Sequence, residues 1–275
     1  MKLSVSNISL PPLKHKKYFS EIRDLGVESI EIAPSRKWEN TWHGLKAREV
    51  QIYRQEIEEA GLEVCGLHSL FFDQPKLSIF GNQKIREQTQ SFIIHLSEVC
   101  RDLGGKTLIF GSPSARCRNG FSKIDAFKIA TEFLNELCHR ITPHGTILCM
   151  ETLPETDTDF LNTVRENLHL LTTLNNNSLG LHLDLRSMVA NNELRDHLIS
   201  KIASILCHVH LNASDLGMFQ TQDKLNCKQF LDLLHAHSYS GVISLEQKMT
   251  KNGNIIKSIE RSIGIIKEII SNHDK

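Results

Sequence analysis

The chain has 275 residues, with 32 lysines and arginines against 32 aspartates and glutamates. This balanced charge gives no bulk attraction to nucleic acid or to an anionic membrane surface, so neither is an expected partner. No apolar stretch approaches the ~18 residues of a membrane-spanning helix, and the amino terminus lacks the apolar segment and cleavage site of a secretion signal. The seven cysteines form no C-x-x-C pair, and we expect a reduced, cytoplasmic protein.

Short apolar, β-branched runs alternate with longer amphipathic stretches from one end of the chain to the other. Some amphipathic stretches end in a glycine just before the next apolar run, as helices often do at their carboxyl ends. In chain order, the predicted elements are strand 2–8, helix 15–25, strand 28–34, helix 46–60, strand 63–71, helix 82–103, strand 107–112, helix 122–141, strand 146–152, helix 158–174, strand 179–185, helix 188–202, strand 205–211, helix 227–237, strand 242–247 and helix 253–271.

The alternation of eight predicted strands with eight predicted helices is typical of a parallel sheet that closes on itself. An open, doubly wound sheet is the alternative, but it normally has a glycine-rich turn after its first strand, and residues 1–13 contain no glycine. The chain shows no linker and no low-complexity segment. We therefore predict an α/β protein with a single (β/α)8 TIM-barrel domain over residues 1–275.

Four polar residues stand at the carboxyl ends of the last four predicted strands. They end or closely follow the apolar runs TILCMET, LGLHLD, ILCHVH and VISLE, and they are Glu151, Asp184, His210 and Glu246. The carboxyl ends of barrel strands meet at one face, where such barrels hold their active sites. Three carboxylates and one imidazole at that face predict a site for a divalent metal ion.

The predicted ligand set narrows the choice of ion. Three carboxylates with one imidazole and no thiolate disfavour a closed structural zinc site. They suit one Mn²⁺, Co²⁺ or Mg²⁺ ion in octahedral coordination, and Zn²⁺ is also compatible. Four protein ligands leave two positions for the oxygens of a substrate, which fits an ion that stabilises charge developing on them. The alternative for each residue alone is an ordinary rim side chain, or a helix cap for Asp184.

Several segments resemble those of one superfamily. ETLP at 151–154, HLD at 182–184, HVHLN at 208–212 and GVISLEQK at 241–248 are similar to the xylose-isomerase-like TIM barrels. That superfamily holds sugar and sugar-phosphate isomerases and epimerases, including the ketose 3-epimerases, together with inosose and dehydroshikimate dehydratases and apurinic-site endonucleases. The resemblance implies that Glu151, Asp184, His210 and Glu246 bind one divalent metal ion.

The resemblance to the ketose epimerases implies a reaction as well. By this resemblance, Glu151 and Glu246 are the catalytic pair: one removes the proton beside a carbonyl to give a metal-stabilised enediolate, and the other returns it. A C–H next to a carbonyl is so weakly acidic that the oxyanion must be stabilised while a positioned carboxylate takes the proton. We therefore expect a metal-dependent isomerase or epimerase of a sugar, a sugar phosphate or a related small hydroxy-carbonyl compound.

The sequence departs from the ketohexose epimerases at three places. Where they usually have a further Glu, a His and an Arg, this chain has Asp157, Ser187 and, near the third place, Leu216, which weakens the assignment to a free ketohexose. The chain instead places Arg186 two residues after Asp184 and Arg116 in the loop after strand 107–112. Guanidinium groups at the barrel mouth would suit a phosphate or carboxylate on the substrate, and solvated loop arginines are the alternative.

Four further side chains are candidates for substrate binding. His68 ends strand 63–71 and would face the mouth, as a substrate contact, a proton relay or a plain rim residue. His182 and His208 lie on the inward face, where they would orient ligands or pack in the core. Trp38 lies in a predicted loop, where its ring would stack on a sugar or pack against the protein itself.

The sequence also bears on three other function classes. A dehydratase of a cyclic polyol or hydroxy-ketone uses the same proton abstraction and is the main alternative. An apurinic-site endonuclease needs extra histidines, including one after strand 107–112, and a basic surface that a neutral chain lacks. A non-catalytic barrel has no reason to hold four such polar groups together. We expect a small-molecule substrate, either neutral or anionic, and the resemblance allows a homodimer or homotetramer.

Overall fold

The computed structural model describes residues 1–251 and 253–273, and its strands run parallel and close into one barrel in chain order. The barrel closes because the first strand also pairs with the last, Lys2 with Val242 and Val5 with Leu245. The predicted fold class is therefore confirmed. The strands are β1 (Lys2–Ser6), β2 (Ser29–Ile32), β3 (Glu63–Leu67), β4 (Thr107–Phe110), β5 (Ile147–Glu151), β6 (Leu179–Asp184), β7 (Leu206–Leu211) and β8 (Val242–Leu245).

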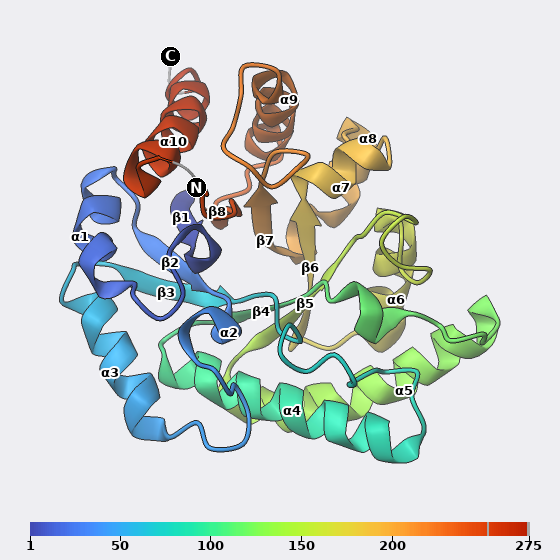
Figure 1. Cartoon of the computed structure of the whole chain (residues 1–275). Helices are drawn as coiled ribbons and strands as arrows, with labels where there is room; N and C mark the ends of the chain where they lie inside the picture. Colours follow the sequence, from blue (N-terminus) through green and yellow to red (C-terminus); the bar gives the residue numbers. More distant parts are fainter. Residues whose placement is uncertain (252, 274–275) are drawn as a thin grey trace.

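Helices surround the barrel on the outside (Figure 1). Within residues 1–251 and 253–273, no helix is long and apolar enough to cross a membrane. The α-helices are α1 (Lys16–Asp24), α2 (Pro34–Lys37), α3 (Ala47–Glu58), α4 (Gln83–Asp102), α5 (Lys123–Ile141), α6 (Val164–Leu174), α7 (Leu185–Ala190), α8 (Asp196–Ile202), α9 (Asp223–Ala236) and α10 (Ile255–Ser271), with short 3-10 helices η1 (Asn7–Ser9), η2 (Pro113–Arg116), η3 (Thr142–His144) and η4 (Ala203–Ile205).

Helix α6 begins later than the predicted 158–174. The Thr163 hydroxyl accepts a hydrogen bond from the Glu166 backbone N–H at 3.1 Å, and the Glu166 carboxylate accepts one from the Thr163 N–H at 3.2 Å. This reciprocal pair satisfies N–H groups at the first turn and fixes the start of the helix at Val164. Residues 158–163 therefore form a loop near the cavity described below.

The predicted helix 188–202 is two helices. Helix α7 starts directly after β6, because the Asp184 side chain accepts a hydrogen bond from the Ser187 N–H. It ends near Asn192, which has a positive φ of 53°, and α8 starts only at Asp196. Left-handed backbone cannot continue a helix, so the predicted single helix was wrong at this point.

Strand register sets which side chains meet inside the barrel. Glu151 is the partner of His182, and Asp184 is the partner of His210. Residues two apart on a strand share a face, so these side chains occupy neighbouring levels of the interior at its carboxyl end. On the opposite wall, Ser6 of β1 pairs with Glu31 of β2. The interior at this end is therefore polar, while the other faces of the strands are packed against helices.

Candidate metal centre

A cavity opens at the carboxyl ends of the strands, with a volume of about 160 Å³. Its lining includes all four side chains singled out by the sequence pattern, so the fold brings the predicted quartet together: Glu151, Asp184, His210 and Glu246. The volume is below the roughly 300–1,000 Å³ of sites for drug-sized ligands. The cavity, called the mouth cavity below, therefore favours a small substrate.

Gly111 makes room for the first carboxylate. It follows β4 and lies on the lining of the mouth cavity. A Cβ atom at this position would overlap Oε2 of Glu151. Only glycine allows the Glu151 carboxylate to lie against the β4 backbone, which is the kind of close approach for which glycine is used.

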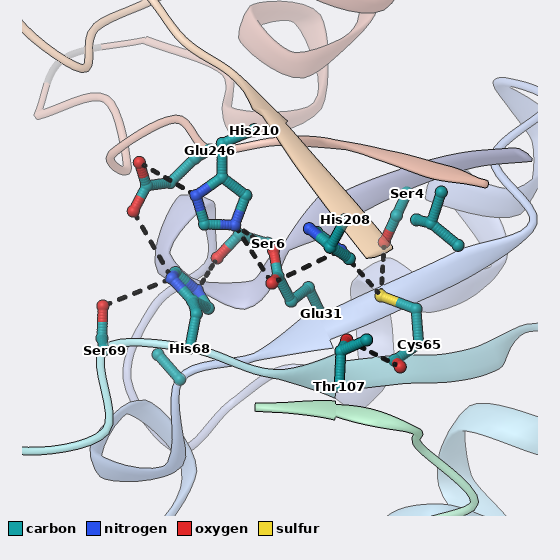
Figure 2. A network of polar contacts seen from close by, with 12 residues as sticks. Ser4, Ser6, Glu31, Cys65, His68, Ser69, Thr107, His208, His210 and Glu246 are labelled. Carbon is teal, nitrogen blue, oxygen red and sulfur yellow. Dashed lines mark hydrogen bonds and ion pairs between the residues drawn. The ribbon is translucent and has the colours of Figure 1, made fainter. Parts of the chain in front are cut away.

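Glu31 orients the ring of His210 (Figure 2). The Nε2 atom of His210 lies 3.0 and 2.9 Å from the two carboxylate oxygens of Glu31. Its Nδ1 atom is buried without a hydrogen-bond partner, 3.9 Å from Asp184 Oδ2 and 3.7 Å from Glu246 Oε2. A carboxylate that accepts the proton of one ring nitrogen turns the other toward a metal ion. Glu31 is fully buried, and the sequence alone left its role open.

Asp184 uses its two oxygens differently. Oδ1 accepts a hydrogen bond from the Ser187 N–H at 2.8 Å, so the helix cap that was the alternative interpretation is present. Oδ2 accepts a short hydrogen bond from the side-chain amide of Asn212, which also donates to Glu246 Oε2 at 2.9 Å. Asn212 thus bridges two carboxylates. The pattern of strand ends did not single out Asn212, although its place two residues after His210 puts it on the same face.

Crowding of the carboxylates separates their proton affinities. Burial, with a further contribution from Asp184, raises the pKa of Glu151 to about 8. Burial also acts to raise the pKa of Glu246, but the charge of His210 and hydrogen bonds from His68 and Asn212 hold it at about 2. Burial acts to lower the pKa of His210, yet Glu31 and Glu246 raise it to about 10. Without a metal ion, the imidazolium of His210 therefore offsets part of the repulsion among these carboxylates.

These residues fit a divalent metal ion. Donor atoms of Glu151, Asp184 and His210, with a ring nitrogen of His182, lie within 4.8 Å of one another. Glu246 adjoins them through its contact with His210. The buried, unpartnered Nδ1 of His210 and the mutual repulsion of the carboxylates are both relieved by a cation. The structure therefore contains a potential metal site of Glu, Asp and His side chains.

The orienting role of Glu31 gives a testable expectation. Replacing Glu31 with Gln should weaken Mn²⁺ or Co²⁺ binding by about 10–100-fold, the usual range when the partner of a ligating histidine is lost. Binding measured by calorimetry would test this, with Glu28→Gln at the other end of the same strand region as the control. Equal affinity in the Glu31 and Glu28 variants would contradict the orienting role.

Comparison with known proteins agrees with this geometry. Residues 19–269 match the family described as xylose isomerase-like TIM barrel. The chain belongs to this family. No match to the chain was found among curated protein sequences.

Solved structures of the xylose isomerase-like fold superpose over the whole chain. An L-ribulose 3-epimerase has a TM-score of 0.81 at 16% identity and covers 100% of this chain and 97% of its own. A 3-keto-D-glucoside 4-epimerase from E. coli has a TM-score of 0.78 at 16% identity, covering 98% and 99%. A D-psicose 3-epimerase from Clostridium cellulolyticum H10, solved with D-tagatose, has a TM-score of 0.75 at 14% identity, covering 99% and 98%. At these identities the likeness shows the shared fold.

His68 lies on the mouth cavity, as predicted for a residue at the end of β3. Its Nδ1 is 3.4 Å from Glu246 Oε1, and its Nε2 is hydrogen-bonded to the Ser6 hydroxyl at 2.5 Å. Figure 2 shows the ring held between these two groups. His68 therefore contacts a predicted catalytic carboxylate, and a substrate contact for it stays a prediction.

His182 and His208 lie one level deeper and are not part of the cavity lining. The Nε2 atom of His208 is 3.6 Å from Glu31 Oε1 and 3.9 Å from Cys65 Sγ. Both ring nitrogens of His182 lack hydrogen-bond partners. The structure corrects their predicted substrate-binding role, because both rings are buried and neither is part of the cavity lining.

Arg116 is a second correction, because it is fully buried and does not line the cavity. Helix η2 turns the loop inward, and Nη1 of Arg116 donates a hydrogen bond to the Glu151 backbone carbonyl at 2.8 Å. Burial lowers the pKa of Arg116 to about 10, against the opposing charge of Glu151. The guanidinium lies behind the end of β5 instead of at the rim.

Arg186 does line the mouth cavity. Its Nη1 forms an ion pair with Asp157 Oδ2 at 3.0 Å, and the two side chains are 33% and 21% exposed. Asp157 stands where ketohexose epimerases usually have a glutamate, and Leu216, near the place of their arginine, also lines the cavity. This side of the mouth cavity therefore carries the ion pair of Arg186 and Asp157, which differs from the family pattern.

Trp38 is a third correction. The side chain is only 7% exposed and packs edge-to-face against Tyr53, with 5.6 Å between ring centroids. It is not part of the cavity lining. The apolar space between α2 and α3 takes the ring, so Trp38 contributes to the core instead of stacking on a substrate.

Proposed function

We propose that the protein is a divalent-metal-dependent isomerase or epimerase of a sugar, a sugar phosphate or a related small hydroxy-carbonyl compound. The observation that carries the proposal is the pair of carboxylates, Glu151 and Glu246, on one small cavity beside a potential metal site. Proton removal next to a carbonyl needs a positioned base, a positioned acid and stabilisation of the oxyanion. The two carboxylates, together with a bound ion, would supply all three.

Glu151, Asp184, His210 and Glu246 would hold the ion, and Mn²⁺, Co²⁺ and Mg²⁺ suit this donor set, with Zn²⁺ also compatible. When bound, a divalent ion supplies a positive charge that stabilises negative charge on a substrate oxygen. The remaining steps belong to side chains of the chain itself.

The two glutamates differ in their surroundings, and this difference suggests their roles. Glu246, whose pKa is held at about 2 by His210, His68 and Asn212 against the effect of burial, is the base that removes the proton beside the carbonyl. Glu151 is the group that returns a proton. Burial raises its pKa to about 8 in the metal-free protein, but a bound ion would displace that proton, so the carboxylate must take up a proton within the cycle before it returns one.

Exchange of substrate hydrogen with solvent tests the proposal. The Mn²⁺-loaded protein would be incubated in ²H₂O with free ketoses, ketose phosphates and cyclic hydroxy-ketones, and deuterium at the carbon beside the carbonyl would be followed by NMR. Exchange with formation of an epimer or isomer supports the proposal. Loss of water to give an unsaturated ketone would identify the dehydratase alternative, which shares the first step, and no exchange in any class would contradict both.

Arg186 bears on whether the substrate is anionic. We propose that the guanidinium can turn from Asp157 to a phosphate or carboxylate of the substrate, because paired N–H donors bind such groups well. Replacing Arg186 with Ala should then raise KM about 10-fold or more for an anionic substrate and much less for its neutral analogue. Steady-state kinetics on both compounds would measure this, with Arg165→Ala on α6 as the control. Equal changes in KM would remove the argument for an anion.

A further inference from the structure

His182 is a buried side chain without a hydrogen-bond partner. It is 0% exposed, and neither ring nitrogen forms a hydrogen bond within the described part of the chain. A neutral imidazole has one N–H donor and one acceptor nitrogen, and leaving both unsatisfied in the interior is unfavourable. Such a ring calls for an explanation in terms of a binding partner.

The position of His182 points to that partner. It precedes Asp184 by two residues on β6, so both face the interior, and it is the register partner of Glu151 on β5. Its ring meets the His210 ring edge-on, with 4.2 Å between centroids. One of its nitrogens lies within 4.8 Å of donor atoms of Glu151, Asp184 and His210.

A separate ion held by the three interior histidines is the competing interpretation, because His182, His208 and His210 also lie within the same range of one another. His210 cannot serve that ion as well. Its Nε2 is engaged by Glu31 at 2.9 Å, and its Nδ1 faces the carboxylates. His208 in turn contacts Glu31, as Figure 2 shows. The group that His182 can complete is therefore the one with Glu151 and Asp184.

We propose that His182 is a fifth protein ligand of the metal ion, added to the quartet that the family resemblance implies. The proposal rests on the proposed metal site. A second imidazole shifts the donor set toward nitrogen, which favours Co²⁺ and Zn²⁺ over Mn²⁺ and Mg²⁺. It also leaves one position of an octahedral ion for a substrate oxygen instead of two.

The test compares His182→Leu with His208→Leu, a change of the same type one strand away. In His182→Leu we expect Co²⁺ affinity to fall more than about 10-fold and Mn²⁺ affinity less, since imidazole discriminates between these ions. The visible absorption spectrum of the Co²⁺-loaded protein should change in His182→Leu and stay near wild type in His208→Leu. Thermal unfolding of the metal-free proteins is the second readout. His182→Leu should keep or raise Tm there, because it removes an unsatisfied polar group.

The outcomes separate this proposal from the function proposed above. Wild-type Co²⁺ affinity and spectrum in His182→Leu, with binding lost in His210→Ala, would overturn the role of His182 and leave the metal site intact. No Co²⁺ binding by the wild-type protein would overturn the metal site itself. A metal-free Tm that falls in His182→Leu would show a packing role, and His182→Gln, which keeps a polar group, would then have to lose the same spectral feature for the proposal to stand.

Discussion

Glu246→Gln should lose solvent exchange at the substrate carbon beside the carbonyl by a factor of about 10²–10⁴, the usual contribution of a positioned base. Glutamine keeps the shape and an oxygen donor but cannot take a proton. The position of Glu246 explains the size of the effect, because His68, His210 and Asn212 all contact its carboxylate and hold it on the cavity. Exchange would be followed by NMR in ²H₂O with saturating Mn²⁺.

Glu151→Gln is the matched comparison. If Glu151 returns the proton, its variant should still exchange the substrate hydrogen but form little epimer or isomer. Metal content must be measured in both variants, since both residues are also proposed ligands, and Glu260→Gln on the outer helix α10 controls for the loss of a carboxylate elsewhere. Normal exchange in metal-loaded Glu246→Gln would show that another group is the base.

The quartet could be predicted from the sequence because the signal is local. Each residue stands at the end of an apolar run, and parallel strands in a barrel end at one face, so the position along the strand fixes the position in space. His68 followed from the same rule. The rule also placed His182 and His208 inside the barrel. It could not predict whether these side chains reach the cavity or lie beneath it, because their depth depends on the register between strands.

The predictions for Arg116 and Trp38 were wrong because these side chains belong to loops. The alternation of a strand fixes where a side chain points, and a loop has no such rule. The sequence around Arg116 looks like an exposed loop, yet η2 turns the guanidinium back to the carbonyl of Glu151. Trp38 lies in a similar loop, and only the tertiary packing against Tyr53 decides its direction. Glu31 could not be given a role from the sequence, because its contact with His210 spans 179 residues of sequence.

Metal binding at pH 7 should release protons, and its apparent affinity should rise steeply with pH. In the metal-free protein, burial acts to lower the pKa of His210, but the charges of Glu31 and Glu246 raise this pKa to about 10. Burial raises the pKa of Glu151 to about 8. A bound ion requires the carboxylate and an unprotonated Nδ1, so both protons must leave. With two protons released, affinity should gain about 100-fold per pH unit below pH 8.

The stability of the metal-free protein and the stabilisation added by metal should change with pH in opposite directions. A pKa raised on folding contributes stability that is full below the unfolded-state value and is lost as pH rises through the folded-state value. The metal-free protein should therefore lose stability as pH rises from the ordinary carboxyl range through about 8, from Glu151, and further toward about 10, from His210. The rise in Tm on adding Mn²⁺ should grow over the same range, because the ion replaces the departing protons.

Calorimetry in two buffers with different heats of protonation measures the number of protons released. Glu31→Gln provides the control, because removing the charge beside Nε2 lowers the pKa of His210 and should reduce proton release while other ligands remain. Binding without proton release at pH 7 would mean that His210 is already neutral in the metal-free protein. In that case Glu31 would act on His210 through orientation alone, and no imidazolium would offset the repulsion among the three carboxylates before the ion arrives.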